Sequence, residues 1–213
     1  MITVKTFPVN PLEENTYVVS DEEGHALIID CGALYTTEYE TISQYIRDNG
    51  LTPEAQLLTH AHFDHTFGVP FIHRTYGLAP RMHDGDRPLY EHTEQQMSLM
   101  MGRPLGEPMP ALGEPLVADA ELPLGSHHFQ IIHTPGHTAG GICLYCKSEG
   151  ILFSGDSLFR QSIGRTDLPG GDYRTLIASL TSLFAWLPDD VTIYPGHGPA
   201  TTAGFERKYN PFL

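Results

Sequence analysis

The sequence is poor in cysteine, and its three cysteines are an odd number. So few cysteines in 213 residues argue against a disulfide framework and favour a reducing compartment. Cys143 and Cys146 form a C-x-x-C motif, but they lie in a run typical of a strand, where residues three apart face opposite sides. We therefore expect no redox or zinc role for this pair, and we expect Cys31 to be a packing residue.

Basic residues and long apolar runs are also scarce. The chain has 12 Lys and Arg against 26 Asp and Glu, which gives a formal net charge of −14, and its basic residues form no cluster. A protein that binds a nucleic acid needs a basic surface, so we expect no nucleic-acid partner. No stretch approaches the roughly 20 continuous apolar residues that span a bilayer, and residues 1–7 are typical of a strand rather than a leader peptide. We predict a soluble, cytoplasmic protein without a membrane partner.

Short apolar runs and helical patterns alternate along the chain. Hydrophobic residues make up 40% of it, enough for a substantial core, and we predict one domain over residues 1–213. The alternation of strand and helix patterns favours a layered α/β fold. We expect strands near residues 2–7, 16–20, 25–30, 56–59, 128–133, 141–146, 151–154 and 191–195, and helices near residues 36–48, 66–76, 86–100, 172–186 and 202–208.

The most informative segment is the run Leu57–His65, which ends in the pattern H-x-H-x-D-H. His60 and His62 are two apart on an extended segment and so point the same way, while Asp64 and His65 can turn toward a neighbouring point. Imidazole and carboxylate ligands suit zinc, iron or manganese. The loop therefore predicts a metal site, and it can serve two ions. The alternative is a loop of solvated histidines.

Three further segments place one polar residue directly after a short apolar run. They are T-P-G-H-T with His137, S-G-D-S with Asp156 and Y-P-G-H-G-P with His197. A glycine precedes the polar residue each time, and glycine permits a sharp turn that aims the next side chain inward. These three residues are further candidate ligands.

The order and spacing of these motifs resemble the metallo-β-lactamase superfamily, and more narrowly its single-domain, glyoxalase II-like hydrolases. The similarity begins at the segment Ile28–Gly32 and runs to the tail Asn210–Leu213. The resemblance implies a four-layer αβ/βα sandwich, in which two mixed sheets pack face to face with helices outside and a metal site at one edge. The predicted order of elements agrees with this architecture.

The resemblance also implies a binuclear centre with two divalent ions, zinc first, with iron or manganese as alternatives. A hydroxide that bridges two ions about 3.5–4 Å apart can attack a carbonyl carbon at neutral pH. The implied ligands are His60, His62 and His137 for the first ion, Asp64, His65 and His197 for the second, and Asp156 between them.

Two aspartates have alternative roles. With one ion bound, Asp64 can act as the base that deprotonates the attacking water instead of as a ligand. Asp30 matches the superfamily's outer-shell aspartate, which holds the second N–H of a ligand histidine. The alternative for Asp30 is an ordinary turn residue at the end of a strand.

Two segments bear on the substrate. The segment Ser162–Asp172 resembles the G-R-T-D-x-P-G-G loop of glyoxalase II-like proteins, where Arg165 can hold a substrate carboxylate or brace Asp167. The Met- and Pro-rich span Asp86–Pro115 is typical of core packing, and the alternative is a pliable lid over an acyl group. Full-length glyoxalase II proteins carry a C-terminal helical domain that binds glutathione, whereas this sequence ends soon after His197. Arg207–Tyr209 could substitute in part, but their spacing is no evidence of a glutathione site.

We therefore predict a thioester hydrolase that converts S-D-lactoylglutathione or a related small-molecule thioester into an acid and a thiol. The first alternative is a persulfide dioxygenase, in which His60, His137 and Asp156 hold one iron ion. That family carries a P-A-H-D-Y-like segment where this chain has P-G-H-G-P, which favours hydrolysis. The second alternative is a metal-binding scaffold without turnover. The oligomeric state stays open.

Overall fold

The computed structural model describes residues 1–102 and 104–213, and its strands form two large mixed sheets and one small two-stranded ribbon. The first sheet has the order β1-β2-β3-β4-β5, and the second has the order β13-β12-β9-β8-β7-β6. Strands β1 to β3 are antiparallel and β3 to β5 are parallel, whereas β9 and β12 are the parallel pair of the second sheet. The first-sheet strands are Thr3–Val9, Glu14–Ser20, His25–Ile29, Thr52–Leu57 and Pro80–Arg81, in chain order. The second sheet has β6 (Glu121–Leu124), β7 (His127–His133), β8 (Ile142–Cys146), β9 (Ile151–Gly155), β12 (Thr192–Pro195) and β13 (Thr201–Thr202).

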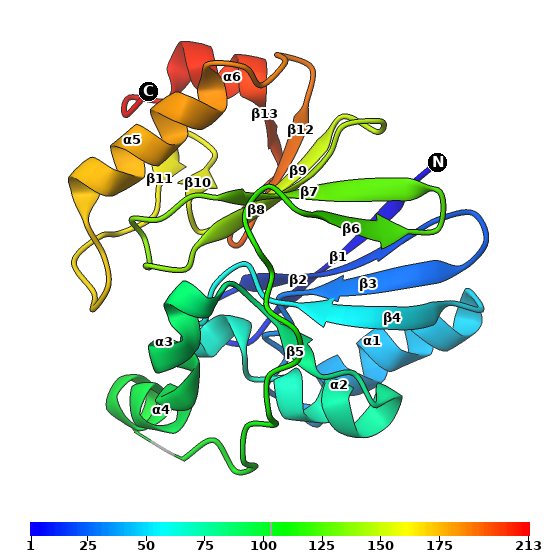
Figure 1. Ribbon diagram of the computed structural model, residues 1–213. Coiled ribbons are helices and arrows are strands. Elements are labelled where there is room, and N and C mark those ends of the chain that lie inside the picture. Colours follow the sequence, from blue (N-terminus) through cyan, green and yellow to red (C-terminus); the bar gives the residue numbers. More distant parts are fainter. Residues whose placement is uncertain (103) are drawn as a thin grey trace.

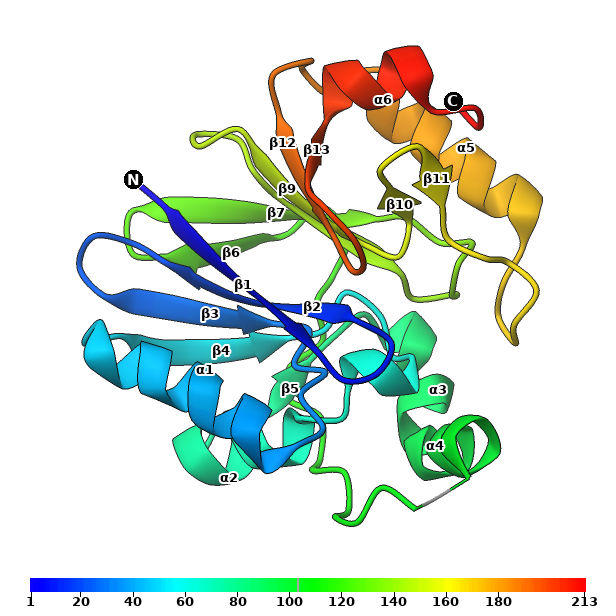
Figure 2. The same ribbon diagram turned by 180° about the vertical axis from the view of Figure 1, so that it is seen from behind.

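Helices cover the outer faces of both sheets (Figures 1 and 2). Helices α1 (Thr36–Asp48) and α2 (Val69–Tyr76) lie outside the first sheet, and α5 (Tyr173–Phe184) and α6 (Ala203–Tyr209) lie outside the second. Helices α3 (Arg87–Glu91) and α4 (Thr93–Met101) lie together at one end of the first sheet. The predicted four-layer sandwich is confirmed.

The strands are apolar on both faces because each sheet is covered on both sides. In β2, Tyr17 and Val19 face the second sheet, while Val18 faces the helices. Phe129 and Phe153 meet the first sheet from the opposite side, and both are fully buried. One core cluster therefore joins the two sheets, and two further clusters lie under the outer helices.

Local sequence signals set the ends of the helices. The carboxylate of Glu38 accepts hydrogen bonds from the backbone N–H groups of Leu34 and Tyr35 at the start of α1. Helix α5 begins after Asp172, whose side chain accepts from the N–H of Thr175, and α2 ends at Gly77 in the left-handed conformation. These caps explain why the predicted helix positions near 36–48 and 172–186 agree with the structure.

The structure differs from the predicted helix over residues 86–100. This span holds two helices, because the chain leaves helical geometry at His92, where φ is −107° and ψ is 18°. The structure adds the one-turn 3-10 helices η1 (Phe63–His65) and η2 (Asp84–Asp86) and the small ribbon β10 (Leu158–Phe159) and β11 (Ser162–Ile163). Among the described residues, no helix is long and apolar enough to cross a membrane.

Candidate metal centre

All seven predicted ligands lie in loops that follow strands. His60 to His65 come after β4 of the first sheet, and the second sheet supplies His137 after β7, Asp156 after β9 and His197 after β12. The side chains converge because these four strands end at the same edge of the sandwich. The structure thus brings together residues that are far apart in the sequence.

The first group consists of three buried histidines, His60, His62 and His137, whose ring nitrogens lie within 4.8 Å of one another. Their ring centroids are 4.5–4.9 Å apart. The Nε2 atom of each ring is buried without a hydrogen-bond partner. A buried polar atom without a partner is costly, so three such nitrogens aimed at one point fit a metal ion that accepts their lone pairs.

The second group consists of Asp64, His65 and His197, which also offer atoms within 4.8 Å of one another. The Nε2 atom of His197 lies 3.2 Å from Asp64 Oδ2. Both ring nitrogens of His65 are buried without a hydrogen-bond partner. Two imidazoles and a carboxylate again suit zinc, iron or manganese.

The carboxylate of Asp156 lies between the two groups. Its Oδ1 atom is 3.4 Å from His65 Nε2, and its Oδ2 atom is 3.6 Å from His137 Nε2 and 3.7 Å from His197 Nε2. His60 Nε2 is 4.0 Å from the same Oδ2 atom. One carboxylate thus faces histidines of both groups, the placement that a bridging ligand requires.

Burial favours the neutral form of two histidines of the first group, His60 and His62. It lowers the pKa of His62 to about 4, and together with the neighbouring imidazoles it lowers the pKa of His60 well below the ordinary value. A neutral imidazole has a free lone pair at neutral pH. These histidines are therefore in the protonation state that metal binding needs.

Carboxylates have the opposite effect on the second group. Burial lowers the pKa of His65, but the nearby carboxylates of Asp156, Asp30 and Asp64 together outweigh burial and raise the pKa well above the ordinary value. For His197, burial is again the largest single influence, but the carboxylates of Asp64 and Asp156 together outweigh it and raise the pKa. Burial raises the pKa of Asp156, yet the facing histidines lower it overall, so this residue stays a carboxylate.

Outer contacts fix the orientation of the ligand rings. The Nδ1 atom of His137 donates to the carbonyl oxygen of Arg165 at 2.7 Å, and that of His197 donates to the carbonyl oxygen of Leu12 at 3.0 Å. With the proton on Nδ1, the Nε2 atom of each ring keeps its lone pair for an ion. Backbone carbonyls thus select the tautomer in two of the three loops that carry candidate histidine ligands.

Asp30 lies where the predicted outer-shell role places it. Its Oδ2 atom is 3.2 Å from His65 Nδ1, and its two oxygens accept hydrogen bonds from the N–H and hydroxyl of Thr59. Asp30 also has a φ of +51°, so it is a turn residue as well. It forms a third group with His60 and His65 within 4.8 Å, but its oxygens are already engaged with Thr59.

Two polar residues at the start of β2 also support the site, and sequence reasoning missed both. Glu14 is fully buried with its Oε1 atom 3.7 Å from His65 Nδ1, and burial raises its pKa well above the ordinary value. Asn15 donates from Nδ2 to the carbonyl oxygens of Pro195 and Gly198, on either side of His197. An acid and an amide at the start of a strand normally indicate an exposed turn, so the sequence carries no signal for either role.

Glycine is required at the turn before His197. A Cβ atom on Gly196 would lie 2.1 Å from Asp156 Oδ1 and 2.7 Å from His65 Cε1. At Gly136 the backbone has a φ of +131°, and a Cβ atom would lie 2.2 Å from the N atom of Leu176. The glycines before the candidate ligands therefore give both the turn and the space.

The remaining sequence predictions have mixed outcomes. The guanidinium of Arg165 is exposed and makes a two-bond contact with Asp167, at 2.7 and 2.8 Å. Met97 is buried against Phe63 and Phe67, which agrees with packing, although Met100 is 55% exposed and residue 103 of that span lies outside the described residues. Cys143 and Cys146 are buried in different clusters on opposite faces of β8, and Cys31 packs under the first sheet.

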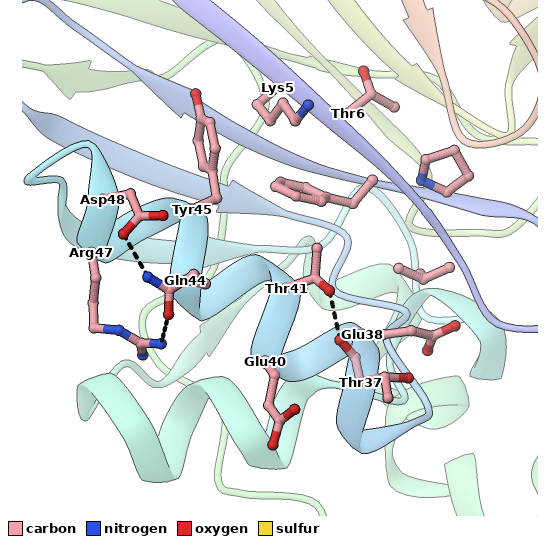
Figure 3. Close-up of a pocket in the computed structure, with 13 residues that line it drawn as sticks. Lys5, Thr6, Thr37, Glu38, Glu40, Thr41, Gln44, Tyr45, Arg47 and Asp48 are labelled. Atoms are coloured by element: carbon pink, nitrogen blue, oxygen red, sulfur yellow. Dashed lines mark hydrogen bonds between the residues drawn. The ribbon is translucent and has the colours of Figure 1, made fainter.

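A large groove lies away from the predicted ligands. It has a volume of about 1080 Å³ and runs between β1 and α1, where Lys5, Tyr45 and Glu38 line it (Figure 3). None of the predicted site residues lines it. Pro8 and Lys5 stand on this edge strand, and both residue types discourage the addition of a further strand. The groove is therefore no part of the candidate metal centre.

Comparison with known proteins identifies similar chains. A family model described as the metallo-beta-lactamase superfamily matches residues 9–197. The probable metallo-hydrolase YqgX of Bacillus subtilis is 35% identical over 98% of this chain and 96% of its own length. The hydroxyacylglutathione hydrolase GloC of Haemophilus influenzae is 34% identical over 100% of this chain and 98% of its own length.

Two solved structures are similar over nearly their whole length. The B3 metallo-β-lactamase BLEG-1 is 38% identical, covers 99% of both chains and has a TM-score of 0.88. TTHA1623, solved in a di-iron-bound form, is 40% identical, with 99% of this chain and 100% of that chain covered and a TM-score of 0.87.

Proposed function

Because the chain belongs to the metallo-β-lactamase superfamily and resembles metal-dependent hydrolases of that family, we propose that it is a thioester hydrolase of the glyoxalase II type. The proposed reaction cleaves S-D-lactoylglutathione, or a related small-molecule thioester, into an acid and a thiol. The observation that carries the proposal is the set of orphaned buried nitrogens around Asp156. The similarity to GloC supports the choice of substrate.

The residues present fit two divalent ions. His60, His62 and His137 would hold one ion, Asp64, His65 and His197 the other, and Asp156 would contact both. Ions in such sites supply a water that ionises near neutral pH and a Lewis acid for the carbonyl oxygen. Zinc is our first choice, and the similarity to a di-iron protein makes iron the next, before manganese.

The side chains themselves order the site. The Nδ1 hydrogen bonds of His137 and His197 hold these two rings in place before any ligand binds. Asp64 is buried against His197, and when only one ion is bound it would accept the proton of the attacking water. A thiol has an ordinary pKa of about 8.5, so a thiolate leaves without a general acid, and no side chain is assigned to that step.

Arg165 has two proposed uses. Its carbonyl oxygen accepts from His137, which links the Arg165 loop to the first group. Its guanidinium is engaged by Asp167 and braces the loop, and an exchange of Asp167 for a substrate carboxylate would turn the same side chain into a binding group. We also propose that residues 1–213 form one domain, since one core joins both sheets, and that the protein acts in the cytoplasm without a nucleic-acid or membrane partner.

The test is anaerobic hydrolysis of S-D-lactoylglutathione by the zinc-loaded protein, followed as loss of the thioester. His62→Ala removes a predicted ligand and should abolish turnover. His128→Ala is the matched control, because His128 is exposed on β7 and its Nδ1 atom lies 3.7 Å from a surface carboxylate, that of Glu121. Turnover in wild type and His128→Ala but not in His62→Ala would support the proposal.

Other substrates separate the alternatives. A metal-loaded wild type that hydrolyses a β-lactam but no thioester would favour the activity named for BLEG-1. Oxygen consumption by the iron-loaded protein with a glutathione persulfide would favour the dioxygenase. Metal binding without turnover of any of these substrates would overturn the thioester proposal and leave a scaffold.

A further inference from the structure

A buried carboxylate outside the predicted ligands connects the loops of the two sheets. Asp86 ends the short helix η2 and has no solvent exposure. Its Oδ2 atom accepts from the backbone N–H of Ala61 at 3.0 Å and from the hydroxyl of Thr138 at 2.8 Å, and its Oδ1 atom accepts from the N–H of Gly140 at 2.6 Å. All these donors belong to the ligand-bearing loops.

The groups that donate to Asp86 lie directly next to candidate ligands. Ala61 stands between His60 and His62 in the first sheet's loop, and Thr138 follows His137 in a loop of the second sheet. These three histidines form the all-histidine group, which is therefore built from two separate loops. Asp86 is a residue from a third segment that binds both.

The three segments fit closely. A Cβ atom on Gly140 would lie 2.4 Å from the N atom of Asp86, and one on Gly85 would lie 2.8 Å from the carbonyl oxygen of Ala139. Backbone therefore packs directly on backbone at this junction. Because the backbone is so closely packed here, the loops have no free space in which to readjust when the side chain at position 86 is changed.

We propose that Asp86 is a positioning residue, which sets the distance between the His60–His62 pair and His137 and thereby the affinity of this group for a divalent ion. The inference rests on the metal role proposed above. A carboxylate can accept all three hydrogen bonds because it has only acceptor atoms. Metal–nitrogen distances tolerate errors of only about 0.2 Å, so a small displacement of one loop costs affinity.

The test measures zinc affinity of the metal-free protein by competition with a chromophoric chelator, together with the visible spectrum of the cobalt-loaded protein. Asp86→Asn has the same shape but turns an amide donor toward donor groups, and we expect about tenfold to 100-fold weaker binding at one site and an altered cobalt spectrum. Asp84→Asn is the matched control, because Asp84 lies in the same turn but is exposed and contacts Arg87. It should bind zinc as the wild type does.

Thr138 offers a second route if Asp86→Asn does not fold, as judged by circular dichroism without metal. Thr138→Val removes one hydrogen bond to Asp86 and keeps the shape, whereas Thr138→Ser keeps the hydroxyl. We expect weaker zinc binding in the Val variant and recovery in the Ser variant. Wild-type affinity and cobalt spectrum in a folded Asp86→Asn, or equal affinities in both Thr138 variants, would overturn the proposal.

The outcome is independent of the thioester assay. A wild type that binds zinc in an Asp86-dependent manner but cleaves no thioester refutes the proposed function and supports the positioning role. If the wild type cleaves the thioester and Asp86→Asn keeps full zinc affinity, the proposed function is supported and the positioning role is refuted.

Discussion

The first sheet carries four candidate ligands on one loop, whereas the second carries three on three separate loops. The segment from His60 to His65 is shaped locally, by the turn η1 and by Asp30 and Thr59 beneath it. His137, Asp156 and His197 meet only because β7, β9 and β12 lie in one sheet. The ligands of the first half thus stand on one continuous segment, whereas those of the second half depend on how three strands are placed in one sheet.

The largest effect is expected from removing Asp156, the residue that lies between the ligands of the first sheet and those of the second. Asp156→Ala deletes the carboxylate that faces histidines of both groups. We expect hydrolysis to fall by about a thousandfold or more, since each tenfold loss is about 1.4 kcal/mol and metal catalysis supplies several kcal/mol. The measurement is turnover together with metal content. Asp190→Ala, an exposed aspartate, is the control, and equal metal content in both variants would contradict the bridging role.

The next largest effect is expected in the core that holds the sheets together. Phe153 is fully buried, and its ring meets those of Tyr17 and Tyr194 at centroid distances of 5.0 and 5.3 Å. Phe153→Ala should lower the free energy of unfolding by about 3–5 kcal/mol, through lost burial and a cavity. Chemical denaturation measures this loss. Phe212→Ala, at a 40% exposed residue, should change it far less, and a similar loss in both variants would exclude a special role for the inter-sheet core.

A substitution of Asn15 tests only the loop of the second sheet that carries His197. Asn15→Asp replaces the two hydrogen bonds that flank His197 with a carboxylate facing the carbonyl oxygens of Pro195 and Gly198. We expect about tenfold weaker binding of one ion, since outer-shell losses cost about tenfold to 100-fold, while the all-histidine group keeps its affinity. Zinc titration of the metal-free protein measures both sites. Asn49→Asp, on an exposed amide at the end of α1, is the control, and parallel loss at both sites would show that the halves are not separable.

The smallest effect lies in the first sheet, remote from either group of ligands. The hydrogen bond from His25 Nδ1 to Glu54, at 2.6 Å, raises the pKa of His25. Because the folded-state pKa is raised, this contact stabilises the protein below the ordinary pKa of about 6.5, and the contribution is lost as the pH rises through the folded-state value. NMR titration should show a lower His25 pKa in Glu54→Gln with unchanged metal affinity. An unchanged pKa would contradict the contact.

Much of the architecture could be predicted because its signals are local. The strand patterns and the glycine before each polar residue predict where His137, Asp156 and His197 stand, and the structure places them beside the segment from His60 to His65. Their roles as metal ligands stay predictions. The confirmed parts are the sandwich fold and the superfamily.

The supporting residues could not be predicted, because their partners are remote in sequence. Glu14 and Asp86 are acidic residues next to turns, where charge normally indicates exposure, yet both are fully buried. Their burial is decided by loops from elsewhere in the chain, and no periodicity encodes such contacts. The end of the helix at His92 could not be predicted for a different reason. The residues around it are acceptable in a helix, and only the packing of α3 and α4 selects two segments.

The hydrogen bonds from Asn15 on either side of His197 also bear on the order in which the two groups can form during protein synthesis. The hydrogen bond from Asn15 to the carbonyl oxygen of Gly198 joins residues 183 positions apart. A nascent chain on the ribosome therefore holds all three histidines of the first group once β7 and the loop after it have emerged, but it cannot complete the second group until β12 has been made and has reached the first sheet. The histidines of the first group are therefore all made before β12, whereas the second group must wait for His197 after that strand.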